Sequence, residues 1–90
     1  MEICAVIVDD EQRHHSILGK MLKNFCPGIN IVGNAYSIRE AIPLIEDKNP
    51  DLVFLDIEMP GGNGFTIFDH FEEPPFQVIF TTAFDLYAIN

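Results

Sequence analysis

Basic side chains are scarce in this sequence. Its 90 residues include five Lys and Arg against 14 Asp and Glu, which gives a formal net charge of −9 at pH 7. Such a surface repels nucleic acid and anionic membranes, because binding to either depends on neutralising phosphate charge with cations. The composition therefore argues against direct contact with nucleic acid or a membrane surface and makes small cations the better candidate ligands.

The sequence also lacks Trp and any apolar run long enough to cross a bilayer, and it contains only two Cys. Met1-Glu2 leads directly into an apolar segment without a charged and apolar leader, so we expect a cytoplasmic protein. In a reducing compartment, Cys4 and Cys26 are expected to be small buried hydrophobic residues rather than a disulfide. Apolar residues make up 48% of the chain, which is enough for one domain of modest stability.

Short apolar segments alternate with amphipathic ones along the whole chain. The apolar segments predict four strands, at residues 3–8, 29–32, 51–56 and 76–81. Apolar residues one turn apart predict helices over residues 11–25, from Ser37 onward, over residues 65–71 and again from Phe84. Ser37 and Glu40 form a capping box, whereas Pro43 predicts a kink or a late start in that helix. The alternation indicates right-handed βαβ units and a parallel sheet with helices on both faces.

Polar residues stand where three of these strands end. The first strand ends in Asp9-Asp10, the third in Asp56 and the fourth in Thr81-Thr82. In open parallel sheets, ligands bind outside the carboxyl ends of the strands. Three carboxylates that meet there cannot all stay ionised without a counter-ion, so we expect a proton or a hard cation such as Mg²⁺ among them. One carboxylate can then act as the nucleophile in phosphoryl transfer, with a Thr hydroxyl on a phosphoryl oxygen.

Three segments of the sequence resemble the receiver domains of two-component response regulators. They are VIVDDE (residues 6–11), PDLVFLDIEMPGGNG (residues 50–64) and VIFTTA (residues 78–83), and the resemblance covers essentially the whole chain. It implies one receiver domain over residues 1–90 with an α/β, flavodoxin-like, doubly wound parallel sheet in the strand order 2-1-3-4. The segment TTAFDLYAI looks most like receivers that precede LytTR-type DNA-binding domains.

The resemblance also implies roles for individual residues. Asp56 matches the phosphoacceptor, and Thr82 matches the switch hydroxyl. Asp9 and Asp10 match the acidic pair that holds Mg²⁺ together with Asp56, and Glu58 matches the residue whose backbone carbonyl completes the metal shell. The implied partners are a sensor histidine kinase, which donates the phosphoryl group, and an output domain in the full-length protein. The domain itself is then a phosphoacceptor rather than an enzyme.

The sequence departs from the family at its end. It stops at Asn90, before the fifth strand, the last helix and the Lys that pairs with the phosphoryl group in receivers. We expect this incomplete receiver to be impaired in phosphorylation, because one neutralising cation is missing. Its fourth strand, with Val78, Ile79 and Phe80, is expected to be an unprotected edge through which two copies form a homodimer.

Other interpretations of the same residues remain open. Asp9-Asp10 can serve as a helix N-cap, and Thr82 can be a strand residue only. The three histidines, His14, His15 and His70, lack metal-ligand spacing and are interpreted as solvated helix surface. Two alternative functions are an Mg²⁺-dependent phosphohydrolase, with Asp56 as nucleophile and Glu58 as general acid, and an interaction module that works without phosphorylation.

Overall fold

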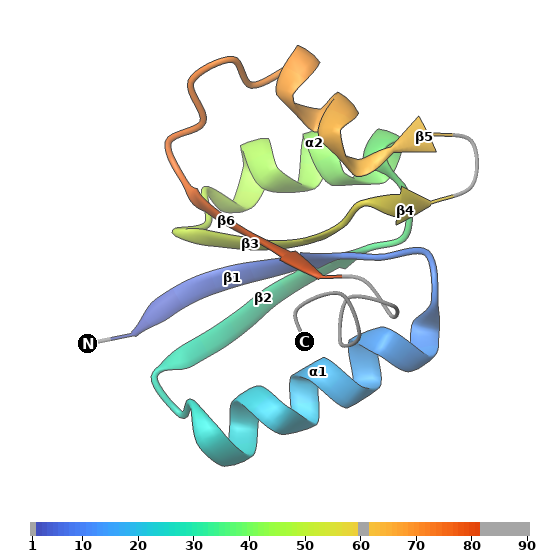
Figure 1. The fold of residues 1–90 in the computed structure, drawn as a ribbon. Coiled ribbons are helices and arrows are strands. Elements are labelled where there is room, and N and C mark those ends of the chain that lie inside the picture. The colour runs from blue at the N-terminus through green and yellow to red at the C-terminus, as the bar shows by residue number, and fades with distance from the viewer. Residues whose placement is uncertain (1, 60–61, 82–90) are drawn as a thin grey trace.

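The fold is built on a four-stranded parallel sheet. The computed structural model describes residues 2–59 and 62–81. The strands of the sheet are β1 (Ile3–Val8), β2 (Ile29–Ala35), β3 (Leu52–Asp56) and β6 (Gln77–Thr81). They lie in the order β2-β1-β3-β6, and every neighbouring pair is parallel (Figure 1). Because β6 is the fourth strand of this sheet along the chain, the predicted order 2-1-3-4 and the α/β class are confirmed.

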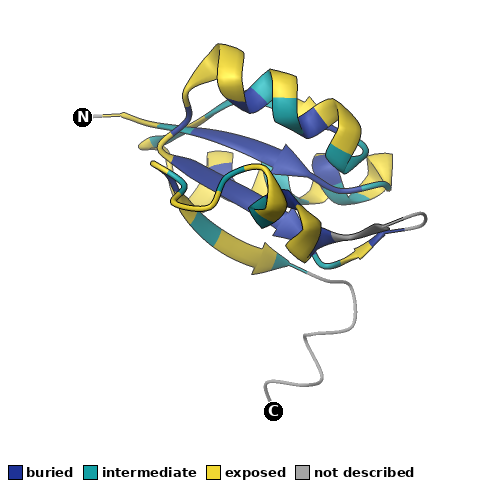
Figure 2. Ribbon diagram, turned by 90° about the horizontal axis from the view of Figure 1, so that it is seen from above, coloured by how far each residue is buried: buried dark blue, intermediate teal, exposed yellow. Residues whose placement is uncertain are grey.

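Helices cover both faces of the sheet. Helix α1 (Gln12–Phe25) lies on one face, and α2 (Ile38–Lys48) lies on the other beside the 3₁₀ helix η1 (Gly64–Asp69) (Figure 1). The central strands β1 and β3 are buried between these layers (Figure 2). Alternate residues of β1 point into separate cores, with Ala5 and Ile7 in the core under α1 and Val6 and Val8 in the core under α2. Burial on both faces explains why the central strands are continuous apolar runs.

The second helix begins where its capping box predicts. Ser37 is the N-cap, and its hydroxyl oxygen accepts the N–H of Glu40 at 3.1 Å. The Glu40 carboxylate reaches back to the N–H of Tyr36 at 3.0 Å. Helix α2 then runs from Ile38 through Pro43, so the predicted late start is wrong. The cap satisfies the N–H groups at the start of the helix and offsets part of the cost of the proline.

Three local predictions differ from the structure. Strand β2 does not close at Gly33 but continues to Ala35, whose carbonyl accepts the N–H of Asp9 at 3.0 Å. The third helix is the short 3₁₀ helix η1, preceded by the hairpin of β4 (Glu58–Met59) and β5 (Gly62–Asn63). Cys26 is exposed rather than buried, because it is the C-cap of α1, where the chain turns in solvent. The helix expected from Phe84 lies outside the described residues.

Across residues 2–59 and 62–81, the helices are too short or too polar to span a membrane.

Candidate functional site

The parallel register brings the carboxyl ends of β1 and β3 together. Val8 of β1 is the register partner of Leu55 of β3, and each is followed by an aspartate, Asp9 and Asp56 respectively. On the other side of β3, Asp56 is the register partner of Thr81 in β6. The sheet thus places acids from two strands at one edge, as the strand ends predicted. Thr82, which follows Thr81, lies outside the described residues.

Asp56 is buried although it stands at the end of its strand. The residue is only 4% exposed, and its Oδ1 accepts a hydrogen bond from the backbone N–H of Glu58 at 3.1 Å. The contact with Glu58 therefore runs through the backbone, while the Glu58 side chain is exposed. This arrangement fits a residue whose backbone shapes the loop after Asp56.

Asp9 is equally buried, at 3% exposure. Its Oδ1 accepts the N–H of Glu11 at 2.9 Å, which fixes the turn between β1 and α1. The N-cap position of α1 is occupied by Glu11, whose side chain makes no capping hydrogen bond. The alternative in which Asp9-Asp10 is the N-cap of the helix is therefore wrong, because both acids precede the cap.

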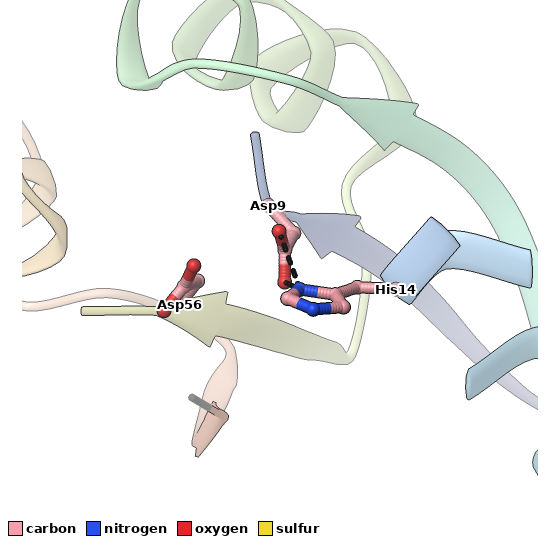
Figure 3. A group of neighbouring side chains, drawn as sticks. All are labelled: Asp9, His14 and Asp56. Atoms are coloured by element: carbon pink, nitrogen blue, oxygen red, sulfur yellow. Dashed lines mark hydrogen bonds and ion pairs between the residues drawn. The ribbon is translucent and has the colours of Figure 1, made fainter. Parts of the chain in front are cut away.

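Two histidines of α1 face this edge, which corrects the prediction that they are solvated. Nδ1 of His14 lies 2.9 Å from Oδ2 and 3.0 Å from Oδ1 of Asp9 (Figure 3). His15 is 6% exposed, with Nε2 2.8 Å from the carbonyl oxygen of Asp9 and Nδ1 2.7 Å from Oδ1 of Asn34. Both residues stand in the first turn of α1, next to the end of β1, so the helix start directs them toward the acids. His70 does lie on the surface, where Nε2 is 3.1 Å from Oε2 of Glu46.

Asp9, His14 and Asp56 form a compact cluster. Each offers one ligand atom, and these atoms all lie within 4.8 Å of one another (Figure 3). The pKa of Asp56 is raised to about 6: burial is the largest cause and the charges of Asp9 and Asp10 add to it, while the Glu58 N–H and His14 act in the opposite direction. The cluster therefore holds more negative charge than its surroundings neutralise, and a bound cation would relieve the imbalance.

The donor set fits a divalent metal ion. Asp9 and Asp56 supply two buried carboxylates whose ligand oxygens lie within 4.8 Å of each other. The half-buried Asp10 lies close enough to raise the pKa of Asp56. Carboxylate oxygens are the donors that Mg²⁺ prefers, and the ion completes its shell with water and phosphate oxygens.

Gly64 lies directly against the backbone that carries Asp56. Its N–H donates to the carbonyl of Ile57 at 2.8 Å. A Cβ at this position would lie 2.9 Å from Cα of Ile57 and still closer to the carbonyl oxygen of Asp56, which is too near for any side chain. The glycine at this place is therefore a steric requirement for the position of the Asp56 loop.

A doubly wound parallel sheet with buried acids at the ends of β1 and β3 is an α/β domain of the class that binds ligands at the carboxyl ends of its strands. Comparison with known proteins identifies the class: residues 5–89 match the response regulator receiver domain family, and the chain belongs to that family. The match confirms the family that the sequence motifs predicted.

Relatives with known sequences and structures agree with this assignment. The chain is 40% identical to an uncharacterized response regulatory protein of Vibrio cholerae over 90 residues, covering 96% of this chain and 34% of that protein. It is 37% identical to the sensory transduction protein LytT of Bacillus subtilis over 88 residues, covering 94% of this chain and 36% of LytT. The response regulator domain of CheB from Thermotoga maritima superposes with a TM-score of 0.79 at 26% identity, covering 99% of this chain and 72% of that domain. The chain thus spans about a third of the length of the Vibrio cholerae protein and of LytT. It is the receiver domain of a two-component response regulator.

Proposed function

We propose that Asp56 accepts a phosphoryl group from a sensor histidine kinase. The observation that carries this proposal is the buried position of Asp56 at the sheet edge, with ligand atoms of Asp9 and His14 within 4.8 Å. The N–H of Glu58 orients this carboxylate. Burial and the charges of Asp9 and Asp10 make its negative charge costly, which favours a cation beside it. Both properties suit a carboxylate nucleophile that becomes an aspartyl phosphate next to a bound cation.

In the proposed reaction, a carboxylate oxygen of Asp56 forms a bond to phosphorus while the phosphorus–nitrogen bond of the kinase phosphohistidine breaks. The leaving imidazole takes a proton from solvent. Asp9, Asp10, Asp56 and the backbone carbonyl of Glu58 would hold Mg²⁺, which neutralises charge on the phosphoryl oxygens when bound. The hydroxyl of Thr82 would donate a hydrogen bond to a phosphoryl oxygen and report phosphorylation to the rest of the domain.

The partners follow from the family and from the length of the relatives. We propose that the full-length protein is cytoplasmic and carries a LytTR-type DNA-binding output domain. The segment TTAFDLYAI resembles receivers that precede such domains, and the match with LytT covers 94% of this chain but only 36% of LytT, which leaves room for an output domain. With a net charge of −9, the receiver domain itself is proposed to make no direct contact with DNA.

We also propose a homodimer through β6. Within the described residues, β6 pairs only with β3, and its Ile79 and Phe80 are exposed. An edge strand with exposed apolar residues favours pairing with a second chain. Size-exclusion chromatography with light scattering should give a dimer whose fraction rises with protein concentration; a monomer at all concentrations would contradict this part of the proposal.

The phosphoacceptor is tested by intact mass after incubation with acetyl phosphate and Mg²⁺. The expected result is one phosphoryl group per chain, which disappears in Asp56→Asn and in the presence of a chelator. Asp69→Asn, which removes an exposed aspartate on η1, should still be modified. If no group is added, the experiment is repeated on a chain extended through the remaining receiver elements, and failure there too would refute the proposal.

A further inference from the structure

The cluster contains an imidazole that the proposed magnesium site does not need. We propose that His14 is a third side-chain metal ligand, with Asp9 and Asp56, when this site binds a transition-metal ion such as Co²⁺ or Ni²⁺. This inference rests on the proposed function, because it concerns the identity of the cation at the same site. It assigns a ligand to the helix α1, whereas the proposed magnesium ligands all come from strand ends.

The positions of the three residues match a shared ion. Ligand atoms that lie about 2.0 to 2.2 Å from one metal ion are about 3 to 4.4 Å from one another. The ligand atoms of Asp9, His14 and Asp56 lie within 4.8 Å of one another, which is close to the span that one bound ion can bridge. The His14 side chain is 26% exposed, and that of Asp9 is 5% exposed, which limits the rotamers that either can adopt.

The second ring nitrogen of His14 also has a suitable neighbour. Nε2 of His14 lies 3.5 Å from Oε2 of Glu11, and the same Glu11 oxygen lies 3.3 Å from Nη2 of Arg13. When Nδ1 bonds to a metal ion, the proton of a neutral ring must sit on Nε2, where it faces the Glu11 carboxylate. Metal-bound histidines commonly donate their other N–H to a carboxylate, which fixes the ring and strengthens the ligand.

Ligand chemistry sets the direction of the selectivity. Imidazole is a good donor for Co²⁺, Ni²⁺ and Zn²⁺, while Mg²⁺ favours oxygen donors and octahedral geometry. Nδ1 of His14 is within hydrogen-bond distance of both carboxylate oxygens of Asp9. An ion that accepts only oxygen ligands must displace the ring from Asp9, whereas an ion that accepts nitrogen can bind Asp9 and the ring together. Removing His14 should therefore have opposite effects on the two kinds of ion.

Calorimetric titration of Co²⁺ and of Mg²⁺ tests this inference. We expect His14→Ala to weaken Co²⁺ binding by at least about tenfold and to leave Mg²⁺ binding equal or tighter. His70→Ala is the matched control, because His70 also pairs with a carboxylate but lies on the surface against α2. All variants are made in a Cys26→Ser background, since the exposed thiol of Cys26 is itself a soft ligand.

Three results would overturn the inference. They are an equal loss of Co²⁺ and Mg²⁺ affinity in His14→Ala, no loss of Co²⁺ affinity, or a similar loss in His70→Ala. If wild type binds neither ion, the proposed function also fails at the metal site, whereas Mg²⁺ binding without any dependence of Co²⁺ on His14 refutes the new ligand alone. If His14→Ala does not fold, ¹⁵N NMR of the wild type with Zn²⁺ decides: Nδ1 of His14 should shift as a metal-bound nitrogen with Nε2 protonated, and an unchanged Nδ1 in the loaded protein refutes the assignment.

Discussion

Asp56→Asn should stabilise this domain at neutral pH in the absence of divalent ions. The pKa of Asp56 is raised from its ordinary value of 3.8 to about 6, first by burial and then by the charges of Asp9 and Asp10. At about 1.4 kcal/mol for each tenfold change in proton affinity, this rise corresponds to at most about 3 kcal/mol of unfolding free energy at pH 7. Solvent at the open edge of the sheet screens part of the repulsion, so we expect a gain of about 1 to 2 kcal/mol.

The sign of this effect gives it a characteristic pH dependence. The folded state holds the Asp56 proton more tightly than the unfolded state, so this group makes the wild type progressively less stable as pH rises from about 4 to about 6, and the loss is complete above that range. Asparagine keeps an oxygen for the Glu58 N–H but carries no charge, so it removes this loss. The difference between the two proteins should be small at pH 4 and largest at pH 7.

Urea unfolding followed by far-UV circular dichroism, with chelator present, measures the difference at each pH. For a domain of this size, a gain of 1 to 2 kcal/mol moves the midpoint by about 1 M. Asp69→Asn is the control, because it removes the same formal charge from an exposed position on η1. The reasoning is refuted if Asp56→Asn is no more stable than wild type at pH 7, or if its advantage is the same at pH 4.

Further predictions concern the groups that hold the site in place. Gly64→Ala forces a Cβ against the backbone of Asp56 and Ile57 and should cost about 1 to 3 kcal/mol in urea unfolding, with slower phosphorylation by acetyl phosphate in the mass assay. His15→Ala leaves the carbonyl of Asp9 without its buried partner and should cost about 2 to 4 kcal/mol, while His70→Ala at the surface should cost less than about 0.5 kcal/mol. Ser37→Ala removes the cap of α2 and should cost about 1 kcal/mol, whereas Ser37→Asp should restore most of the loss.

The strands and the acids at their ends were predictable from the residue pattern, whereas the strand order 2-1-3-4 came from the resemblance to receiver domains. Parallel strands buried on both faces must be apolar along their whole length, and β1 and β3 show this directly. Once two such strands are neighbours, the residue after each strand lies at the same edge, so Asp9 and Asp56 had to meet. The hydrophobic pattern and the chirality of βαβ connections predicted the parallel sheet, while the pairing of β1 with β3 came with the strand order that the resemblance to receiver domains implied.

The local conformation after β3 was not predictable in the same way. Phe65, Phe68 and Phe71 have helical spacing, but the chain there forms a 3₁₀ helix over Gly64–Asp69. Phe68 and Phe71 pack against the core while Phe65 is 50% exposed, and the spacing does not distinguish a 3₁₀ turn from a short α-helix. The N–H of Gly64 also bonds to the carbonyl of Ile57, a contact with the turn after β3 that the spacing of the Phe residues does not contain.

The histidines show a different limit. Periodicity assigns a helix face from its apolar residues, so it passed over His15, although His15 stands three and seven residues before Leu18 and Leu22 on the same buried face. The signal that could have located both histidines is their position: they stand in the first turn of the helix that follows Asp9-Asp10, and the start of that helix lies at the same sheet edge as the acids. A polar side chain in this turn is near the site even when it faces away from the main core.

The same groups link the stability of the domain to its ligands. Burial and the neighbouring acids make an ionised Asp56 costly, and the fold tolerates the cost because β3 and the turn after it hold the side chain in place. Any cation that binds the folded cluster and not the unfolded chain recovers part of that free energy, so its binding must raise the unfolding free energy as its concentration rises. His14 already offsets part of this cost from within the chain, because it lowers the pKa of Asp56. If His14 is a metal ligand as proposed, the affinity of the site for a given ion depends on whether that ion replaces the imidazole or binds it.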